Sequence, residues 1–170
     1  MENQENLEEM ENKIPCFILV GGKSSRFGDD KSKLFYKIQF DKCKKIFKNV
    51  FFVAKEKKFK KYPFFIEKSK IFAPIFALEE IIKKEKKIFV LSVDTPLISE
   101  KSIKKLLNNK ATASKNPLIG YYDYTMLKKI KESTKTDLRL FHINPKKIRI
   151  NNKELININK KEDLKLIRKF

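Results

Sequence analysis

Short apolar runs alternate along the chain with stretches in which apolar residues recur at helical spacing. Continuous apolar runs are typical of strands buried on both faces of a parallel sheet. They predict strands at residues 16–20, 50–54, 64–66 and 88–93. Helical spacing predicts helices at residues 41–48, 74–84, 100–107, 125–132 and 161–169. Weaker runs predict strands at residues 111–114 and 118–122, and a strand pair at 147–150 and 155–158.

The order of these elements predicts the fold class. Strands and helices alternate without a linker rich in Pro, Gly or Ser, which favours one α/β domain over residues 14–170. A polar extension, residues 1–13, precedes it. We expect a Rossmann-like three-layer sandwich with a mostly parallel central sheet.

The segment after the first strand has an unusual composition. Three of the four glycines in the chain, Gly21, Gly22 and Gly28, lie here, together with Arg26 and Lys31. Glycine allows positive φ angles and a close approach of a ligand to backbone amides. Cations beside such a segment favour an anion, most simply a polyphosphate.

Two familiar phosphate-binding motifs are excluded. A P-loop ending at Gly22 requires a glycine five positions earlier, where Phe17 stands. The dinucleotide fingerprint requires one residue between its first two glycines, whereas Gly21 and Gly22 are adjacent.

Asp94 directly follows the strand predicted at residues 88–93, and Pro96 comes two residues later. Ligands of open parallel sheets bind beyond the carboxyl ends of the strands, which is also where the glycine segment lies. Mg²⁺ is commonly held by one or two carboxylates together with substrate phosphates and water. An acidic residue in this position can therefore be a magnesium ligand, although an Asp-x-Pro segment alone is equally often only a turn.

Residues 19–31 read L-V-G-G-K-S-S-R-F-G-D-D-K, which resembles the L-A-G-G-x-S-x-R-M-G-x-D-K signature of the molybdenum cofactor guanylyltransferases. This family lies within the group of enzymes that resemble nucleoside-diphosphate-sugar pyrophosphorylases. Residues 155–164 resemble the family's V-N-V-N-T-P-E-E-L segment, whose asparagines face the active site. Asn116 begins a weaker match to an H-P-x-x-A/G segment.

The resemblance implies roles for individual residues, all within an α/β fold of the nucleotidyltransferase type. It implies catalytic roles for Arg26, Lys31 and Asp94, and a magnesium site at Asp94. It implies nucleotide binding by Leu19, Val20, Gly21, Gly22, Lys31, Lys68 and Asp94, and substrate binding by Asn157 and Asn159.

Two of these positions differ from the family. Lys68 stands where the family has an acidic nucleotide-binding residue, and the neighbouring Glu67 takes that place only if the local register differs. The family also has an asparagine near the strand at residues 50–54, where Val53 or Lys55 stands.

The implied reaction is the Mg²⁺-dependent transfer of GMP from GTP to the molybdopterin cofactor, with pyrophosphate as the second product. The implied partners are GTP, molybdopterin and, transiently, cofactor-accepting molybdoenzymes or chaperones. A related nucleotidyltransferase acting on a sugar phosphate or another phosphorylated acceptor is one alternative. A non-catalytic basic module that binds nucleic acid is another.

Charge and the N-terminal residues bear on these alternatives. The formal net charge is +19, but the lysines are spread along a chain also rich in Asn, Ile and Phe. A general compositional bias explains this pattern better than a nucleic-acid surface does. The N-terminal residues are polar and acidic, unlike a signal peptide, and no apolar run approaches transmembrane length. We expect a soluble, cytoplasmic protein without membrane partners.

Overall fold

The computed structural model describes residues 13–20, 29–158 and 161–167. The described strands form one seven-stranded sheet in the order β3-β2-β1-β4-β6-β5-β7. Neighbouring strands run parallel except on the two sides of β6, where the pairing is antiparallel. The strands are β1 (Cys16–Leu19), β2 (Val50–Ala54), β3 (Phe64–Ile66), β4 (Lys87–Ser92), β5 (Thr112–Ala113), β6 (Asn116–Asp123) and β7 (Lys147–Ile148).

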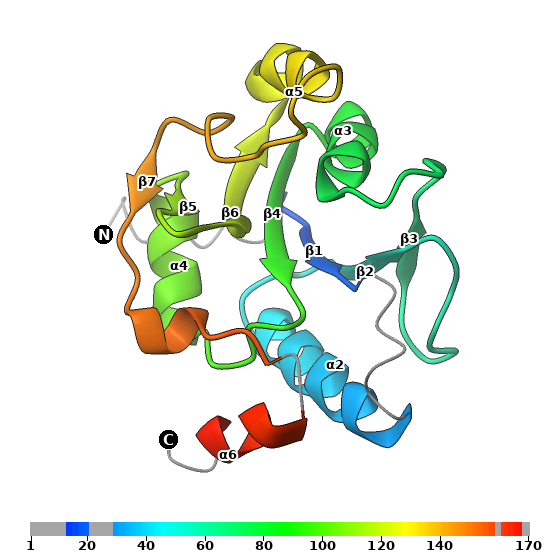
Figure 1. Ribbon diagram of the computed structural model, residues 1–170, viewed down its shortest axis with the longest axis vertical. Helices are drawn as coiled ribbons and strands as arrows, with labels where there is room; N and C mark the ends of the chain where they lie inside the picture. Colours follow the sequence, from blue (N-terminus) through cyan, green and yellow to red (C-terminus); the bar gives the residue numbers. More distant parts are fainter. Residues whose placement is uncertain (1–12, 21–28, 159–160, 168–170) are drawn as a thin grey trace.

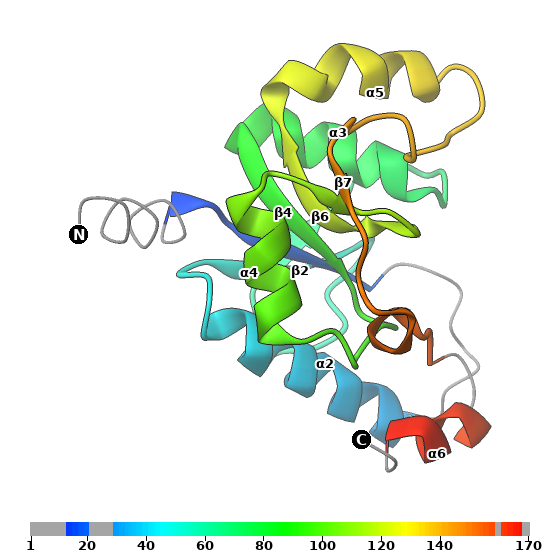
Figure 2. The same cartoon turned by 90° about the vertical axis from the view of Figure 1, so that its left-hand side faces the viewer.

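Helices cover both faces of this sheet (Figures 1 and 2). The α-helices are α2 (Asp29–Lys44), α3 (Pro74–Glu85), α4 (Glu100–Asn108), α5 (Leu127–Ser133) and α6 (Leu164–Ile167). Shorter 3₁₀ turns are η1 (Tyr124–Met126), η2 (Asn152–Leu155) and η3 (Lys161–Asp163). This architecture confirms the expected three-layer α/β sandwich with a mostly parallel sheet.

Alternate residues of β1 belong to two separate hydrophobic cores. Cys16 and Ile18 pack in the core that includes residues of α2 and α4, whereas Phe17 packs in the core of α3 and α5. Because successive strand side chains point to opposite faces, β1 is buried on both sides, as its continuous apolar run predicted.

The topology places a crevice at one end of the sheet. From β1 the chain passes through α2 to β2 on one side, and β4, which follows α3, pairs with β1 on the other side. Ligands bind at such a switch point, beyond the carboxyl ends of the strands.

Two predicted elements near this crevice were wrong. The helix expected at residues 41–48 instead spans Asp29–Lys44. Its buried positions Tyr36, Gln39 and Cys43 recur at helical spacing, but Gln39 is polar, so the apolar pattern did not extend the predicted helix towards its start. Residues 155–158 form no strand paired with 147–150. Instead β7 pairs with β5, and the Asn151 side chain accepts a hydrogen bond from the backbone of Lys153 that begins the η2 turn.

The C-terminal helix begins later than predicted, since residues 161–163 form η3 and α6 begins at Leu164. Among the described residues, no helix has the length and hydropathy needed to cross a bilayer.

Position 120 in β6 requires glycine for two reasons, its positive φ angle and the lack of space for a Cβ atom. Its φ is +149°, and a Cβ atom there would lie 2.4 Å from the Thr112 Cα and 2.6 Å from the Ala111 carbonyl oxygen. We expect Gly120→Ala to lower the free energy of unfolding by about 1–3 kcal/mol, as overpacking does elsewhere. Urea unfolding measures this. Ser114→Ala, which adds no atoms nearby, should change it by less than about 0.5 kcal/mol, and equal effects would contradict the steric argument.

Candidate active site

The turn after β4 carries Asp94 and joins three parts of the chain. The backbone N–H of Val93 donates to the carbonyl of Leu19 at 3.1 Å, so the turn lies beside the last residue of β1. The N–H of Ile158 donates to the carbonyl of Asp94 at 2.7 Å. The Ser92 hydroxyl donates to the Asp94 carboxylate. The half-buried carboxylate of Asp94 is thus held where β1, β4 and the C-terminal segment meet.

One pocket of about 400 Å³ opens at the carboxyl ends of β1, β2 and β3. We call it the β2–β3 pocket. Its lining combines an apolar floor with four charged side chains and one exposed aromatic ring. The lining residues are Leu19, Val53, Ala54, Lys55, Glu56, Lys58, Glu67, Phe72, Ala73, Pro74 and Ala77.

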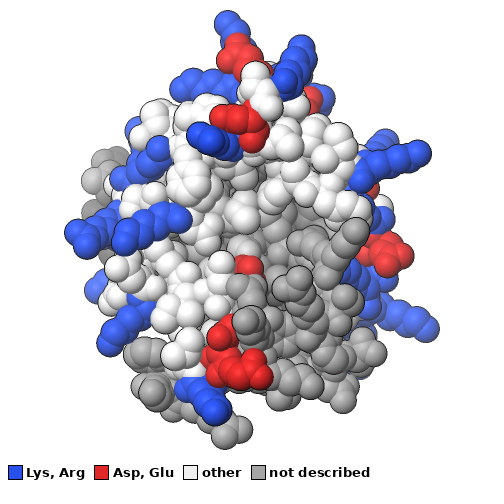
Figure 3. All heavy atoms as spheres, viewed as in Figure 1, with Lys and Arg blue, Asp and Glu red and all other residues white. Residues whose placement is uncertain are grey.

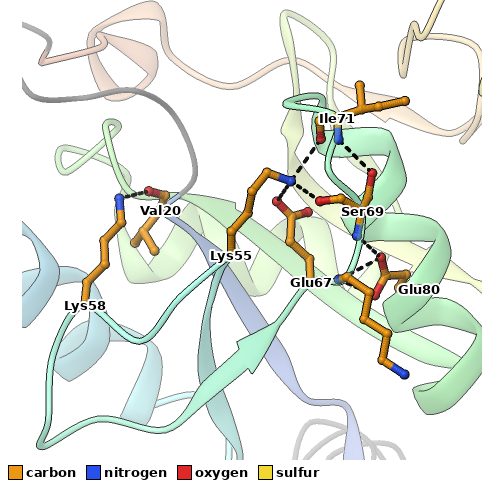
Figure 4. A network of polar contacts seen from close by, with 8 residues as sticks. Val20, Lys55, Lys58, Glu67, Ser69, Ile71 and Glu80 are labelled. Atoms are coloured by element: carbon orange, nitrogen blue, oxygen red, sulfur yellow. Dashed lines mark hydrogen bonds and ion pairs between the residues drawn. The ribbon is translucent and has the colours of Figure 1, made fainter.

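Lys55 is the centre of a polar network in the β2–β3 pocket (Figure 4). Its ammonium lies 2.8 Å from the Glu67 carboxylate and donates to the carbonyls of Ile71, at 3.0 Å, and of Ser69. It also lies 4.7 Å from the centre of the Phe72 ring. The Glu67 side chain is only 9% exposed. The pocket therefore presents an opposite pair of charges beside an aromatic ring, a combination suited to the polar edge and flat face of a nucleobase.

Lys58 places a further cation at the start of the glycine segment. Its ammonium donates to the carbonyl of Val20 at 3.2 Å, and the N–H of Val20 donates to the carbonyl of Val53 at 3.1 Å. Lys58 and Phe72 belong to no recognisable motif, and Lys55 was named from sequence only as a residue near the family's asparagine.

The structure places Glu67, and not Lys68, in the pocket. The N–H of Glu67 continues the β2–β3 ladder by donating to the carbonyl of Ala54 at 3.0 Å. Lys68 is exposed, does not line the pocket, and its N–H donates to both carboxylate oxygens of Glu80 at 3.0 and 3.1 Å. The two-residue period of a strand puts Glu67 on the same side of the sheet as Phe65, which is half-buried against the core of α3 and α5.

A second pocket, of about 710 Å³, contains Asp94 and is called the Asp94 pocket here. It brings together Asp94, Asn116 and Asn157, three residues from separate sequence motifs. Pro74 lines both pockets, so they adjoin. The remaining lining residues are Ser92, Lys115, Pro117, Leu118, Leu138, Arg139, Leu140, Phe141, Asn152, Leu155 and Ile156.

Several residues expected in the site lie outside the described residues. These are Gly21, Gly22, Arg26 and Asn159. Of Lys31 the structure describes only the backbone, which lies in the first turn of α2.

The oxygen donors of the Asp94 pocket suit a hard divalent cation. Asp94 offers a carboxylate, and Asn116 and Asn157 carry amide oxygens. Within the described ranges, no cluster of three or more His, Cys, Asp or Glu residues could hold a metal. A single carboxylate fits Mg²⁺, which keeps several waters and takes phosphate oxygens from its substrate. It does not fit a closed structural metal site.

Glu154 anchors the segment that carries Asn157. Its carboxylate accepts the backbone N–H of Ser99 at 2.8 Å at the start of α4. Burial raises the pKa of Glu154, but hydrogen bonds from Ser99 and Ser102 and the charge of Lys42 outweigh this and lower the pKa below its ordinary value.

An acid with a lowered folded-state pKa stabilises the protein above its unfolded pKa and loses that contribution as pH falls. We expect Glu154→Gln to be less stable than the parent near pH 6 and to approach it in stability below about pH 4. Thermal unfolding across this range measures the difference. Glu132→Gln, at an exposed site in α5, should show no such convergence, and a pH-independent difference for Glu154→Gln would contradict the assignment.

Comparison with known proteins agrees with this geometry. Residues 16–128 match the family model described as a MobA-like NTP transferase domain. The molybdenum cofactor guanylyltransferase of Campylobacter jejuni strain RM1221 is 41% identical over 132 residues, covering 65% of this chain and 69% of that protein. The probable molybdenum cofactor guanylyltransferase of Aquifex aeolicus is 34% identical over 181 residues, covering 89% of each chain.

A solved structure shows the same fold. Molybdopterin-guanine dinucleotide biosynthesis protein A from Archaeoglobus fulgidus superposes with a TM-score of 0.72 at 16% identity, covering 92% of this chain and 100% of that one. The fold, the family match and the two adjoining pockets define a nucleotidyltransferase. The chain belongs to the MobA-like NTP transferase domain family.

Proposed function

We propose that this protein transfers GMP from GTP to the molybdopterin cofactor, forming the molybdopterin guanine dinucleotide cofactor and pyrophosphate. One observation carries the proposal. Two pockets adjoin at the switch point of the sheet, and the second contains a carboxylate held beside the end of β1. A transferase with two substrates needs such a pair of sites around one charged centre. The names of the relatives support the choice of substrates.

The β2–β3 pocket is the proposed site of the guanine base. The carboxylate of Glu67 can accept hydrogen bonds from the N1–H and amino group of guanine, and the Lys55 ammonium beside it keeps that carboxylate in place. Leu19, Val20, Gly21 and Gly22 would contribute backbone contacts to the nucleotide. On this assignment Glu67 takes the role that the resemblance implied for position 68.

The Asp94 pocket is the proposed acceptor site. Asn157 and, by the resemblance, Asn159 would bind the acceptor, and the exposed Arg139 side chain offers a cation for its negative charge. Pro74 separates this site from the base site, so the acceptor phosphate would approach the triphosphate from the side of Asp94.

The chemistry needs positioning and charge neutralisation rather than a covalent intermediate. The acceptor phosphate attacks the α-phosphorus in line while the bond to pyrophosphate breaks. Arg26 and Lys31 are proposed to neutralise the triphosphate and the departing pyrophosphate. Asp94 is proposed to hold Mg²⁺, which when bound supplies positive charge to the phosphate oxygens.

On the face seen in Figure 3, the described charged side chains form no basic patch of the kind that a nucleic-acid surface presents. In Figure 3 the described Lys and Arg side chains project around the rim of the visible face and do not gather in one patch. We place the reaction in the cytoplasm, where nucleoside triphosphates are available. We also propose that the protein transiently contacts molybdoenzymes or chaperones that receive the cofactor.

Incubation of the purified protein with Mg²⁺, molybdopterin and each of the four nucleoside triphosphates tests this function. We expect the dinucleotide and pyrophosphate in equal amounts, with GTP as the preferred donor. Product from CTP alone would refute the choice of guanine. Turnover with sugar phosphates but not with molybdopterin would refute the acceptor. Tight, salt-sensitive binding of duplex DNA without turnover would refute the enzyme assignment.

A further inference from the structure

A buried amide in α2 lies directly under the turn that carries Asp94. Gln39 is 0% exposed. Its Nε2 donates to the carbonyl of Ser92 at 3.2 Å and to the carbonyl of Thr95 at 2.9 Å, on either side of Asp94. A polar side chain this deeply buried is costly unless its hydrogen bonds are made, and here both of its donors are used within one turn.

Lys42, one helical turn further along α2, completes the arrangement. Its ammonium donates to the Gln39 Oε1 at 3.1 Å and to the carbonyl of Pro96 at 2.7 Å. The amide of Gln39 is therefore fixed at both its nitrogen and its oxygen. Together the two side chains connect α2 to three carbonyl groups of the segment at residues 92–96.

The same helix begins immediately after the glycine segment and carries Lys31. Lys31 and Gln39 are eight residues apart, or about 12 Å along a helix axis. A continuous helix is stiff over this length, so the position of α2 relative to the Asp94 turn also sets the position of its first turn, where the backbone of Lys31 lies. The link through Gln39 and Lys42 thus connects the two sides of the proposed phosphate site.

We propose that Gln39 is a positioning residue, which holds the Asp94 turn at a set distance from α2 so that the carboxylate of Asp94 and the phosphate-binding end of α2 face the same triphosphate. Gln39 itself touches neither substrate nor metal. This inference rests on the proposed function, because it assigns Asp94 to the metal and Lys31 to the phosphates.

The chain offers a matched control for a variant at Gln39. Asn144 is a buried amide, 1% exposed, whose Nδ2 donates to the carbonyls of Lys110, at 3.0 Å, and Tyr121, at 2.8 Å. It lies away from both pockets described above and lines neither. Gln39→Met and Asn144→Leu each remove a buried amide that joins two backbone carbonyls. Their effects on general stability should therefore be similar.

The test compares these variants with the parent protein in two measurements. Steady-state kinetics gives kcat, the KM for GTP and the Mg²⁺ concentration for half-maximal rate. Electron paramagnetic resonance of Mn²⁺ in the presence of GTP gives metal affinity without turnover. Because a small misplacement of reacting groups can cost up to about 100-fold, we expect Gln39→Met to lower kcat and metal affinity about tenfold each. The KM for GTP should change less than twofold, and Asn144→Leu should change neither kcat nor metal affinity.

The outcomes separate the inference from the function on which it rests. If the parent protein neither turns over GTP nor binds Mn²⁺ with it, the proposed function fails. If the parent is active and Gln39→Met resembles Asn144→Leu in all measurements, the positioning role is wrong. If Gln39→Met does not fold, Lys42→Met decides. Lys42→Met should lower both kcat and metal affinity, as expected for Gln39→Met, whereas Lys42→Arg should retain both. Parental values of kcat and metal affinity for Lys42→Met would overturn the inference.

Discussion

Asp94→Asn is expected to lower kcat about 100- to 1000-fold, the loss seen when one preorganised electrostatic group is removed from an active site. The substitution keeps the size of the side chain and can keep the hydrogen bond from the Ser92 hydroxyl. It removes the negative charge that we assign to the metal. Affinity for Mg²⁺ should fall with kcat, whereas affinity for GTP measured without metal should change little. Steady-state kinetics over a range of Mg²⁺ concentrations measures both effects.

Asp123→Asn is the matched control for this variant. Asp123 ends β6, and its carboxylate accepts the backbone N–H of Thr125 at 3.0 Å, away from the Asp94 pocket. An amide oxygen can accept the same bond, so we expect activity within a factor of two of the parent. If Asp94→Asn retains full activity at low Mg²⁺, then Asp94 is not the metal ligand.

Glu67→Gln is expected to reduce the preference for GTP over ATP, measured as the ratio of kcat/KM values, by about 100-fold. This corresponds to the upper part of the range, about 1–3 kcal/mol, for a bidentate contact to a base. A carboxylate accepts both donors on the guanine edge, whereas an amide can accept only one of them and presents a donor to the other. The loss should appear in kcat/KM for GTP, while ATP is used as poorly as before or slightly better.

Glu79→Gln is the corresponding control, because Glu79 also pairs with a lysine, Lys83, at 2.5 Å, but lies outside both pockets. It should leave the GTP preference unchanged. Glu67→Gln also weakens the pair with Lys55, so thermal unfolding of both variants without nucleotide is needed. An unchanged GTP preference in a folded Glu67→Gln protein would remove Glu67 from base recognition.

Strands with a strong local pattern could be predicted from sequence to within a residue. The bounds of β2 and β3 are those expected, and β4 differs by one residue at each end. A central strand can be recognised from its own residues alone, because burial on both faces requires an uninterrupted apolar run. The start of α2 was missed because Gln39 is a polar residue in a buried helical position. Its burial depends on carbonyls 53 and 56 residues away.

Motifs likewise pointed to part of the candidate site and missed the rest. Leu19, Val20, Asp94 and Asn157 were singled out from short patterns, and Asp94 and Asn157 line one pocket. Position 68 was chosen by alignment of a short segment, but the ladder between β2 and β3 brings Glu67 to the pocket instead. A shift of one residue reverses the face of a strand, and only the pairing with a neighbouring strand determines that register.

The amino-acid sequence by itself determined the α/β class, the parallel strands around β1 and the glycine segment followed by cations, because each depends on neighbours along the chain. The tertiary structure alone decided that Lys55 pairs with Glu67, that Asn116 joins Asp94 and Asn157, and that Gln39 supports the Asp94 turn. These contacts join residues from different elements. They exist only once burial of the two cores has set the strand register and the helix positions.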